Sequence, residues 1–423
     1  MKSAERSLWR GGTLSGLVAG RRIAPLETLQ SPAYRHLWAA SLLWNQARWM
    51  DRVVLGWVVL EMTNSAWDLA VLEALRWLPL LIFGMMGGAI ADRIDRRRVL
   101  IGAQSLALVV CCVVGVLLAL NAFSFGLATV ATFLLGVQWA VDWPTRRSLI
   151  PDLVGRRLTL NAVALEALSQ NVTRIIGPLL AGVLVAYWSP AAAFACMAGL
   201  YVVEIVLLKR MALSAEVQAR PAANVPMLRY LVDGFATLRY SQPIVGVLLI
   251  SVFMNVLVFP YQQLLPVFAR DALHVDAVGL GALSAAAGLG SVIGALAIVG
   301  TLRVPKSAQL FWVGSALMGV CLTVFAVSQD FGFALLLLAL SGLGQAAYSS
   351  LQTTIVLSTA TDDLRGRAMG ALTLAIGCTP FGSLEIGAVA VALGAPVAVA
   401  ANAGLCAVLV CLVALRLPRF RSA

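Results

Sequence analysis

The sequence has 423 residues, of which 60% are hydrophobic and only 12% are charged, and its formal net charge is +11. About a quarter of the residues in a soluble globular domain are charged, so this composition excludes a water-soluble enzyme or binding domain of this length. The positive charge does not indicate a nucleic-acid-binding protein, because the basic residues occur in short groups between apolar runs rather than on one basic face. The composition predicts a membrane protein whose main solvent is lipid.

Apolar stretches of about 20 residues, the length that crosses a bilayer, recur along the chain. Residues 1–36 are basic and contain no signal-peptide cleavage pattern, so we interpret them as a retained cytoplasmic tail. The remainder predicts an all-α membrane protein with twelve transmembrane helices. We expect the spans at 37–60, 69–90, 99–120, 123–143, 161–187, 190–208, 243–268, 277–300, 307–327, 331–355, 366–390 and 393–416.

The least apolar connection, residues 209–242, divides the chain into two halves of six spans each. Gly136-Val-Gln138 in the fourth span resembles Gly342-Leu-Gly344-Gln345 in the tenth, which indicates related halves. Transporters with parallel halves bind substrate between them near the membrane midplane. The expected segments are an N-terminal six-helix bundle at 37–208, a cytoplasmic central loop at 209–242, a C-terminal six-helix bundle at 243–416 and a cytoplasmic tail at 417–423.

Most of the 31 Lys and Arg residues lie in the tails and the even-numbered connections, whereas the opposite side carries only Arg270. Because positive residues favour the cytoplasmic side, we expect both termini in the cytoplasm. The natural setting is a bacterial cytoplasmic membrane, crossed many times.

The connection after the second span reads Gly88-Ala-Ile-Ala-Asp92-Arg93-Ile-Asp95-Arg96-Arg97. It resembles the G-x-x-x-D-R-x-G-R-R loop of the major facilitator superfamily, with Asp95 where the superfamily often has glycine. The resemblance implies two six-helix bundles that rock to give alternating access. It also implies that a loop latches the outward-open state, with its residues at Gly88, Asp92, Arg93, Arg96 and Arg97.

Further stretches resemble one branch of that superfamily. Gly177, Pro178 and Gly182 match the glycine-proline motif of antiporter members, and Asp363-Leu-Arg365-Gly366-Arg367 leads to Pro380-Phe-Gly382. Together they resemble the efflux subgroup that contains the enterobactin exporter and macrolide efflux proteins. The resemblance implies export of a drug-like or siderophore-like molecule in exchange for protons. An uptake carrier, a lysophospholipid flippase-type carrier and a non-transporting scaffold are the alternatives.

Charged residues inside the membrane are costly, so each needs a partner or a function. The first span carries Asn45, Arg48, Asp51 and Arg52, and the second carries Glu73 and Arg76. Residues three or four apart share a helix face, and the hairpin between the spans brings the two sets to similar depth. We expect a mixed-sign cluster, either as a cavity lining with a proton relay or as a structural ion-pair network.

Other polar residues extend this list of candidates. Gln138 and Gln345 are uncharged contacts on spans expected to line the cavity, and Glu166 and Arg174 serve either coupling or helix support. Glu385 has no basic residue near it in its own helix, so it and Asp51 are the expected coupling acids. Asp142 is expected in a salt bridge at the inner end of span four, and Glu204 near Lys209.

The sequence also limits the possible energy sources, cofactors and partners of the protein. No phosphate-cradling loop is present, so ATP does not drive it directly, and neither histidine suggests a metal or catalytic site. We expect no cofactor beyond the proton gradient, no metal and no nucleic acid. The expected partners are a small-molecule substrate and membrane lipids, and the expected oligomeric state is a monomer.

Overall fold

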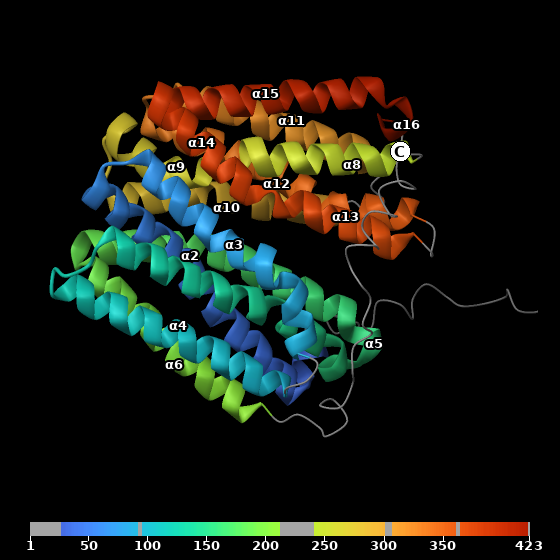
Figure 1. The fold of residues 1–423 in the computed structure, drawn as a ribbon. Helices are drawn as coiled ribbons and strands as arrows, with labels where there is room; N and C mark the ends of the chain where they lie inside the picture. Colours follow the sequence, from blue (N-terminus) through green and yellow to red (C-terminus); the bar gives the residue numbers. More distant parts are fainter. Residues whose placement is uncertain (1–26, 92–94, 212–240, 301–306, 361–363, 422–423) are drawn as a thin grey trace, which may run out of the picture.

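The structure is a computed structural model that describes residues 27–91, 95–211, 241–300, 307–360 and 364–421. The described chain is built from helices that follow the apolar stretches of the sequence (Figure 1). They are η2 (Thr28–Gln30), α2 (Pro32–Thr63), α3 (Ala66–Ala91), α4 (Arg96–Ala119), α5 (Phe125–Tyr187), α6 (Pro190–Arg210), α8 (Gln242–Phe253), η4 (Met254–Val258), α9 (Tyr261–Val267), η5 (Phe268–Ala272), α10 (Ala277–Gly300), α11 (Ser307–Ala326), α12 (Phe331–Thr359), α13 (Arg365–Gly377), α14 (Thr379–Leu393), α15 (Ala395–Arg416) and α16 (Pro418–Arg421).

The helices form two bundles, α2–α6 and α8–α15, which we call the N-terminal and C-terminal bundles (Figure 1). In the first, α5 packs against α2 and α3, and α4 against α6. In the second, α12 packs against α10 and α11, and α11 against α15. The bundles meet where α5 contacts α10 and α3 contacts α14. The predicted fold class is confirmed. The expected central loop lies outside the described residues except at its ends.

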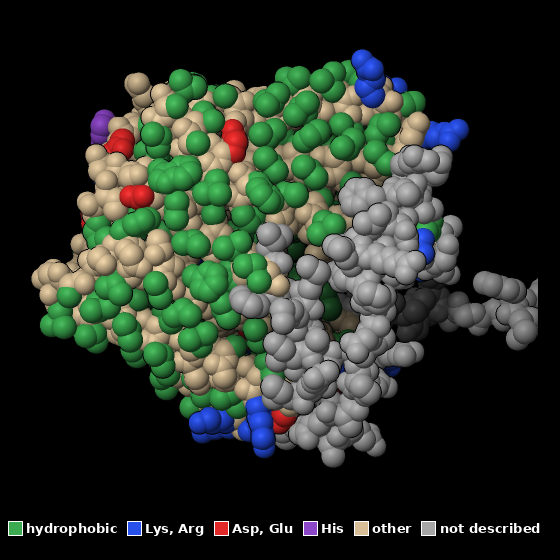
Figure 2. Space-filling view, viewed as in Figure 1, with side chains coloured by type: hydrophobic (Ala, Val, Ile, Leu, Met, Phe, Trp, Pro, Cys, Tyr) green, Lys and Arg blue, Asp and Glu red, His purple; other side chains and the backbone are tan. Residues whose placement is uncertain are grey.

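Ten helical stretches of the described chain are long and apolar enough to cross a membrane. α2 and α3 cover the two other expected spans. The outward faces of the helices are apolar, since Val109, Val113 and Val116 on α4 are 58%, 50% and 57% exposed. Figure 2 shows hydrophobic side chains across the visible face, with Lys and Arg at its right and lower margins. Such a surface is stable only in contact with lipid.

The connection expected between spans four and five is helical, so the predicted end of span four at residue 143 is wrong. α5 continues through Pro144 and Pro151, and its backbone leaves the helical region at Gly155, where φ is 73°. Glycine adopts this conformation without the penalty that other residues incur. The added turns persist because Leu149 and Ile150 are buried in an apolar cluster with helix α2.

Two other spans are interrupted near their middle. In the seventh, a π-helical turn, η4, joins α8 to α9, and the Phe259 N–H donates to the Met254 carbonyl at 2.8 Å. Pro260 follows directly and lacks the N–H that would continue the helix. In the eleventh, α13 gives way to α14 one residue before Pro380. Such interruptions often mark functional positions.

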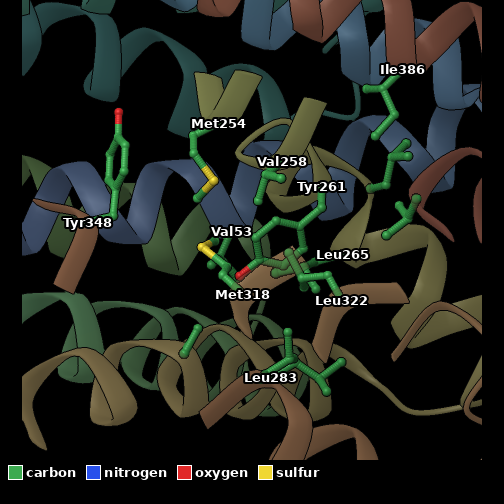
Figure 3. Close-up of a cluster of buried hydrophobic side chains, with 14 of the residues drawn as sticks. Val53, Met254, Val258, Tyr261, Leu265, Leu283, Met318, Leu322, Tyr348 and Ile386 are labelled. Carbon is green, nitrogen blue, oxygen red and sulfur yellow. The ribbon is translucent and has the colours of Figure 1, made fainter. Parts of the chain in front are cut away.

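Apolar side chains pack continuously from one bundle to the other. Figure 3 shows Tyr261 of α9 in a buried cluster with Val53 of α2 and Met318 of α11. The glycine-proline motif lies at this contact, where a Cβ built on Gly182 would be 2.3 Å from the Ala277 carbonyl oxygen. A residue larger than glycine would therefore separate α5 from α10.

Candidate functional site

A cavity of about 240 Å³ lies between the bundles. Its wall differs on the two sides. The N-terminal bundle contributes charged and aromatic side chains, namely Arg48, Trp49, Arg52, Glu73, Trp77 and Arg174. The C-terminal bundle contributes mostly uncharged polar side chains, namely Asn255, Gln262, Gln263, Gln345, Tyr348, Gln352, Thr379 and Ser383, together with Phe259, Pro260 and Ile376.

Helices α2 and α3 hold the expected mixed-sign cluster. Arg52 pairs with Glu73 at 2.5 Å, and Arg76 pairs with both Asp51 and Glu73, the latter at 3.3 Å. Trp77 also donates its indole N–H to Glu73 at 2.9 Å. The one carboxylate in the cavity wall is therefore already held by two guanidinium groups and an indole. The hairpin argument placed these residues together correctly.

Arg48 differs from its neighbours because no carboxylate of the described residues lies within ion-pair distance of it. Its guanidinium lies 4.2 Å from the centre of the Trp139 ring and 5.6 Å from that of Trp44. Aromatic faces attract a cation weakly, by roughly 0.5–2 kcal/mol, and they leave its N–H donors free. Arg48 therefore offers an unneutralised positive charge to the cavity.

Arg174 joins the two bundles. Its guanidinium donates to Gln345 on α12 at 2.6 Å and lies 5.2 Å from the Trp49 ring. Arg52 makes a parallel link to Gln262 at 3.1 Å. Among the described residues Arg174 also has no carboxylate partner. Counted together, the wall of the cavity has three guanidinium groups and one carboxylate, so it is a cationic surface.

On the opposite wall, uncharged groups bind one another. Asn255 donates to the Tyr348 hydroxyl at 2.9 Å and accepts from Thr379 at 3.2 Å. Gln263 donates to the Ser383 carbonyl at 2.8 Å. The side-chain amide oxygen of Gln263 and the Ser383 hydroxyl are buried without a hydrogen-bond partner among the described residues. These groups are available to a ligand or to water.

Six expected site residues lie away from the cavity wall. Asp51 and Arg76 belong to the ion-pair cluster behind it, Glu166 belongs to a second buried group described below, and the other three are Asn45, Gln138 and Glu385. Asn45 is buried and donates to the Ser41 carbonyl at 2.8 Å. Gln138 lies inside the N-terminal bundle and donates to Gln104 at 3.1 Å. Glu385 is half-buried on α14 and accepts from Asn402 of α15 at 2.6 Å, so it has a donor that its own helix does not supply.

A second charged group lies within the N-terminal bundle; it confirms one expectation and corrects another. Arg146 donates to Asp142 through two nitrogens, each at 2.9 Å, and to Glu204 at 2.7 Å. Both carboxylates are fully buried. Asp142 therefore forms the expected salt bridge, whereas Glu204 pairs with Arg146 rather than with Lys209. Glu166 approaches the same group through Ser41. Glu204 and Arg146 are 58 residues apart, so sequence spacing gives no sign of their contact.

The described part of the expected latch makes contacts inside the N-terminal bundle. Arg96 pairs with Asp152 at 2.8 Å, Arg97 donates to the Lys209 carbonyl, and Asp95 caps α4 by accepting from the Arg97 N–H at 2.9 Å. Gly88 lies in α3. Asp92 and Arg93 lie outside the described residues.

Several known proteins are similar to this chain in sequence. The chain is 27% identical to the enterobactin exporter EntS of Escherichia coli O1:K1 / APEC over 92% of its length and 94% of that protein. It is 24% identical to the staphyloferrin A transporter of Staphylococcus aureus, covering 83% and 87% of the two chains. It is 26% identical to the multidrug efflux pump Tap of Mycolicibacterium fortuitum, covering 81% and 85%.

Solved structures agree in fold. A bacterial homologue of the human lysosomal transporter Spinster, in an inward-facing conformation, superposes with a TM-score of 0.71 at 14% identity over 96% of this chain and all of that one. The nucleoside transporter NupG gives a TM-score of 0.72 at 11% identity, covering 92% and 99%. The model of the family described as transmembrane secretion effector matches residues 23–423. This chain therefore belongs to the transmembrane secretion effector family of major facilitator transporters and is a multi-pass bacterial membrane transporter rather than an enzyme.

Proposed function

We propose that this transporter exports a small organic anion of the siderophore-like type, in exchange for protons and by alternating access. The observation that carries the proposal is the excess of guanidinium groups over carboxylates in the cavity wall. Two relatives, the enterobactin exporter and the staphyloferrin A transporter, are named for siderophores. We also propose that the protein is a monomer with both termini in the cytoplasm.

The physical argument concerns the cost of unpaired charge. A cation held away from water is stabilised when an anion accepts hydrogen bonds from it, because an isolated buried charge is strongly unfavourable. Arg48 and Arg174 have aromatic and amide neighbours but no carboxylate among the described residues. A carboxylate or catecholate group entering the cavity supplies the missing counter-charge through charge-assisted hydrogen bonds. Trp49 and Trp77 add flat apolar surface for the remainder of the molecule.

Proton exchange supplies the driving force in this proposal. Of the two acids that the sequence favours, Asp51 has the better support, because it is 3% exposed, faces Arg76, and has one carboxylate oxygen without a partner. We do not assign the coupled proton to Glu385, because that side chain is only half-buried, lies apart from the buried ion pairs of the N-terminal bundle, and already accepts from Asn402 at 2.6 Å. The latch role of the Asp92–Arg97 loop remains part of the proposal.

The test is transport into inside-out membrane vesicles. Catecholate and polycarboxylate chelators should accumulate in the lumen and release protons from it, whereas a cationic macrolide should not. Arg48→Met and Arg174→Gln should each strongly reduce accumulation of the anions.

Equal transport of the macrolide, unaffected by either substitution, would show that the anion assignment is wrong. Movement of anions only out of such vesicles would favour an uptake carrier. Movement of lysophospholipid between leaflets, with no response to the chelators, would favour the flippase alternative.

A further inference from the structure

The buried charged group of the N-terminal bundle has an excess of acids. Asp142, Glu166 and Glu204 are 0%, 7% and 0% exposed, and they surround one buried guanidinium, that of Arg146. Arg147 is exposed and lies against the Trp143 ring at 4.4 Å. With every carboxylate ionised, the buried set would carry two uncompensated negative charges, which a low-dielectric interior strongly disfavours.

The hydrogen bonds within this group single out Glu204. Asp142 accepts from two nitrogens of Arg146 and from the Gln104 amide at 2.5 Å, so it is satisfied as a carboxylate. Glu204 accepts one bond, at 2.7 Å from Arg146, and its second oxygen, Oε2, is buried without a partner. An unpartnered oxygen is far less costly on a neutral carboxylic acid than on a carboxylate.

We propose that Glu204 binds and releases the proton that this transporter exchanges for its substrate. The inference rests on the proposed proton antiport and gives it a second, more deeply buried site than Asp51. The proton joins Glu204 Oε2 while the bundles are open to the outside, and the group is then a neutral acid beside the Asp142–Arg146 pair. The proton leaves to the cytoplasm when the opposite opening forms.

The polar groups of this buried set come from every neighbouring helix. Helix α2 contributes Ser41, which accepts from Arg146 at 3.1 Å, and Tyr34, which lies near Glu166 and donates its hydroxyl to the Ala162 carbonyl at 2.9 Å. α4 contributes Gln104, and α6 contributes the buried phenol of Tyr201. The charged groups are those of α5, namely Asp142, Arg146, Arg147 and Glu166. Arg146 is thus the one buried cation that the described residues place beside Glu204.

A series of hydrogen bonds runs from this group to Trp44, whose ring lies beside Arg48 of the cavity wall. Asp142 is bonded to Gln104, Gln104 to Gln138 at 3.1 Å, and Gln138 to the Trp44 indole at 3.5 Å. Trp44 also has Arg146 and Arg48 over its ring, at 5.2 and 5.6 Å from the centroid. An anion that draws Arg48 into the cavity removes one of the two cations on Trp44. Arg146 can then move toward the ring, which lengthens and weakens its ion pair with Glu204.

The first arm of the test detects the proton without transport. Infrared spectra of the purified full-length protein in lipid nanodiscs should contain the C=O band of a buried protonated carboxyl group, titrating with pH. The band should be lost in Glu204→Gln and shifted in frequency in Glu204→Asp, but unchanged in the control Glu61→Gln, whose carboxylate is exposed on α2. A band that is unaffected in both Glu204 variants overturns the proposal. The aspartate variant keeps the test decisive if the glutamine variant does not fold.

The second arm measures coupling in proteoliposomes, with a catecholate chelator as the probe. Glu204→Gln should exchange labelled for unlabelled chelator at the wild-type rate, yet lose accumulation driven by a pH gradient down to the level of empty vesicles. Full gradient-driven accumulation in that variant overturns the proposal. Absence of exchange in the wild type would contradict the proposed substrate instead, and the infrared band would still decide whether Glu204 holds a proton.

Discussion

The two bundles share a fold but differ in where they hold charge. All six charged side chains that are buried among the described residues, Asp51, Arg76, Asp142, Arg146, Glu166 and Glu204, belong to the N-terminal bundle. The buried polar groups of the C-terminal bundle are neutral, such as Asn255, Gln263 and Gln345. The difference indicates a division of labour. The N-terminal bundle holds the charged groups that bind charged ligands, and the C-terminal bundle completes the cavity with neutral hydrogen-bonding groups.

The largest effect should come from removing Arg146, the single buried cation among Asp142, Glu166 and Glu204. Arg146→Met leaves Asp142 and Glu204 buried without their cation, and removing one partner of a buried pair costs about 3–5 kcal/mol. Thermal unfolding in detergent should show a large fall in stability. Arg147→Met is the matched control, because Arg147 is exposed and should change stability by less than about 1 kcal/mol. Similar losses in both variants would contradict the comparison of bundles.

A smaller effect is expected at the cavity. Arg174→Gln removes one positive charge beside Trp49, and a hydrogen bond to a charged group contributes roughly 1.5–3 kcal/mol. Anionic chelators should bind about 10- to 100-fold more weakly, since 1.4 kcal/mol corresponds to a factor of ten. Isothermal titration calorimetry measures this directly. Gln352→Leu, on the neutral wall, should change affinity much less, and a loss equal to that of Arg174→Gln would show that the walls are not distinct.

The neutral wall should tolerate loss of one of its own hydrogen bonds. Tyr348→Phe removes the hydroxyl that accepts from Asn255, and a neutral hydrogen bond contributes about 0.5–1.5 kcal/mol. The melting temperature should fall slightly, while the ratio of protons to exported substrate stays at its wild-type value. A changed ratio in proteoliposomes would place part of the coupling in the C-terminal bundle.

The smallest effect is expected at Glu385. Glu385→Gln keeps an acceptor for the Asn402 amide and changes none of the buried charged groups of the N-terminal bundle. Proton-driven export should therefore continue at the wild-type rate, whereas Asp51→Asn should slow it. If Glu385→Gln loses coupling in the same vesicles, Glu385 takes part in proton transfer. Coupling would then not be confined to the N-terminal bundle.

The sequence predicted the local features well because they follow from spacing. Arg52, Glu73 and Arg76 meet since one helical turn and one tight hairpin fix their positions. The long-range pairs were not predictable in the same way. Arg174 and Gln345 are 171 residues apart, and their contact depends on how two bundles pack. The helical course of α5 was also missed, because Pro144 and Pro151 are typical of a break, whereas buried Leu149 and Ile150 hold the helix together.

The position of Trp49, with Arg52 and Arg174 over its ring at 5.4 and 5.2 Å, has a practical consequence. Ten of the eleven tryptophans of the chain precede residue 211, and Trp312 is the remaining one. Intrinsic fluorescence therefore originates almost entirely from the half of the molecule that holds the charge. A ligand that draws either arginine away from Trp49 changes the electric field at that indole, so the emission reports cavity occupancy without any attached label, and Trp49→Phe identifies its share.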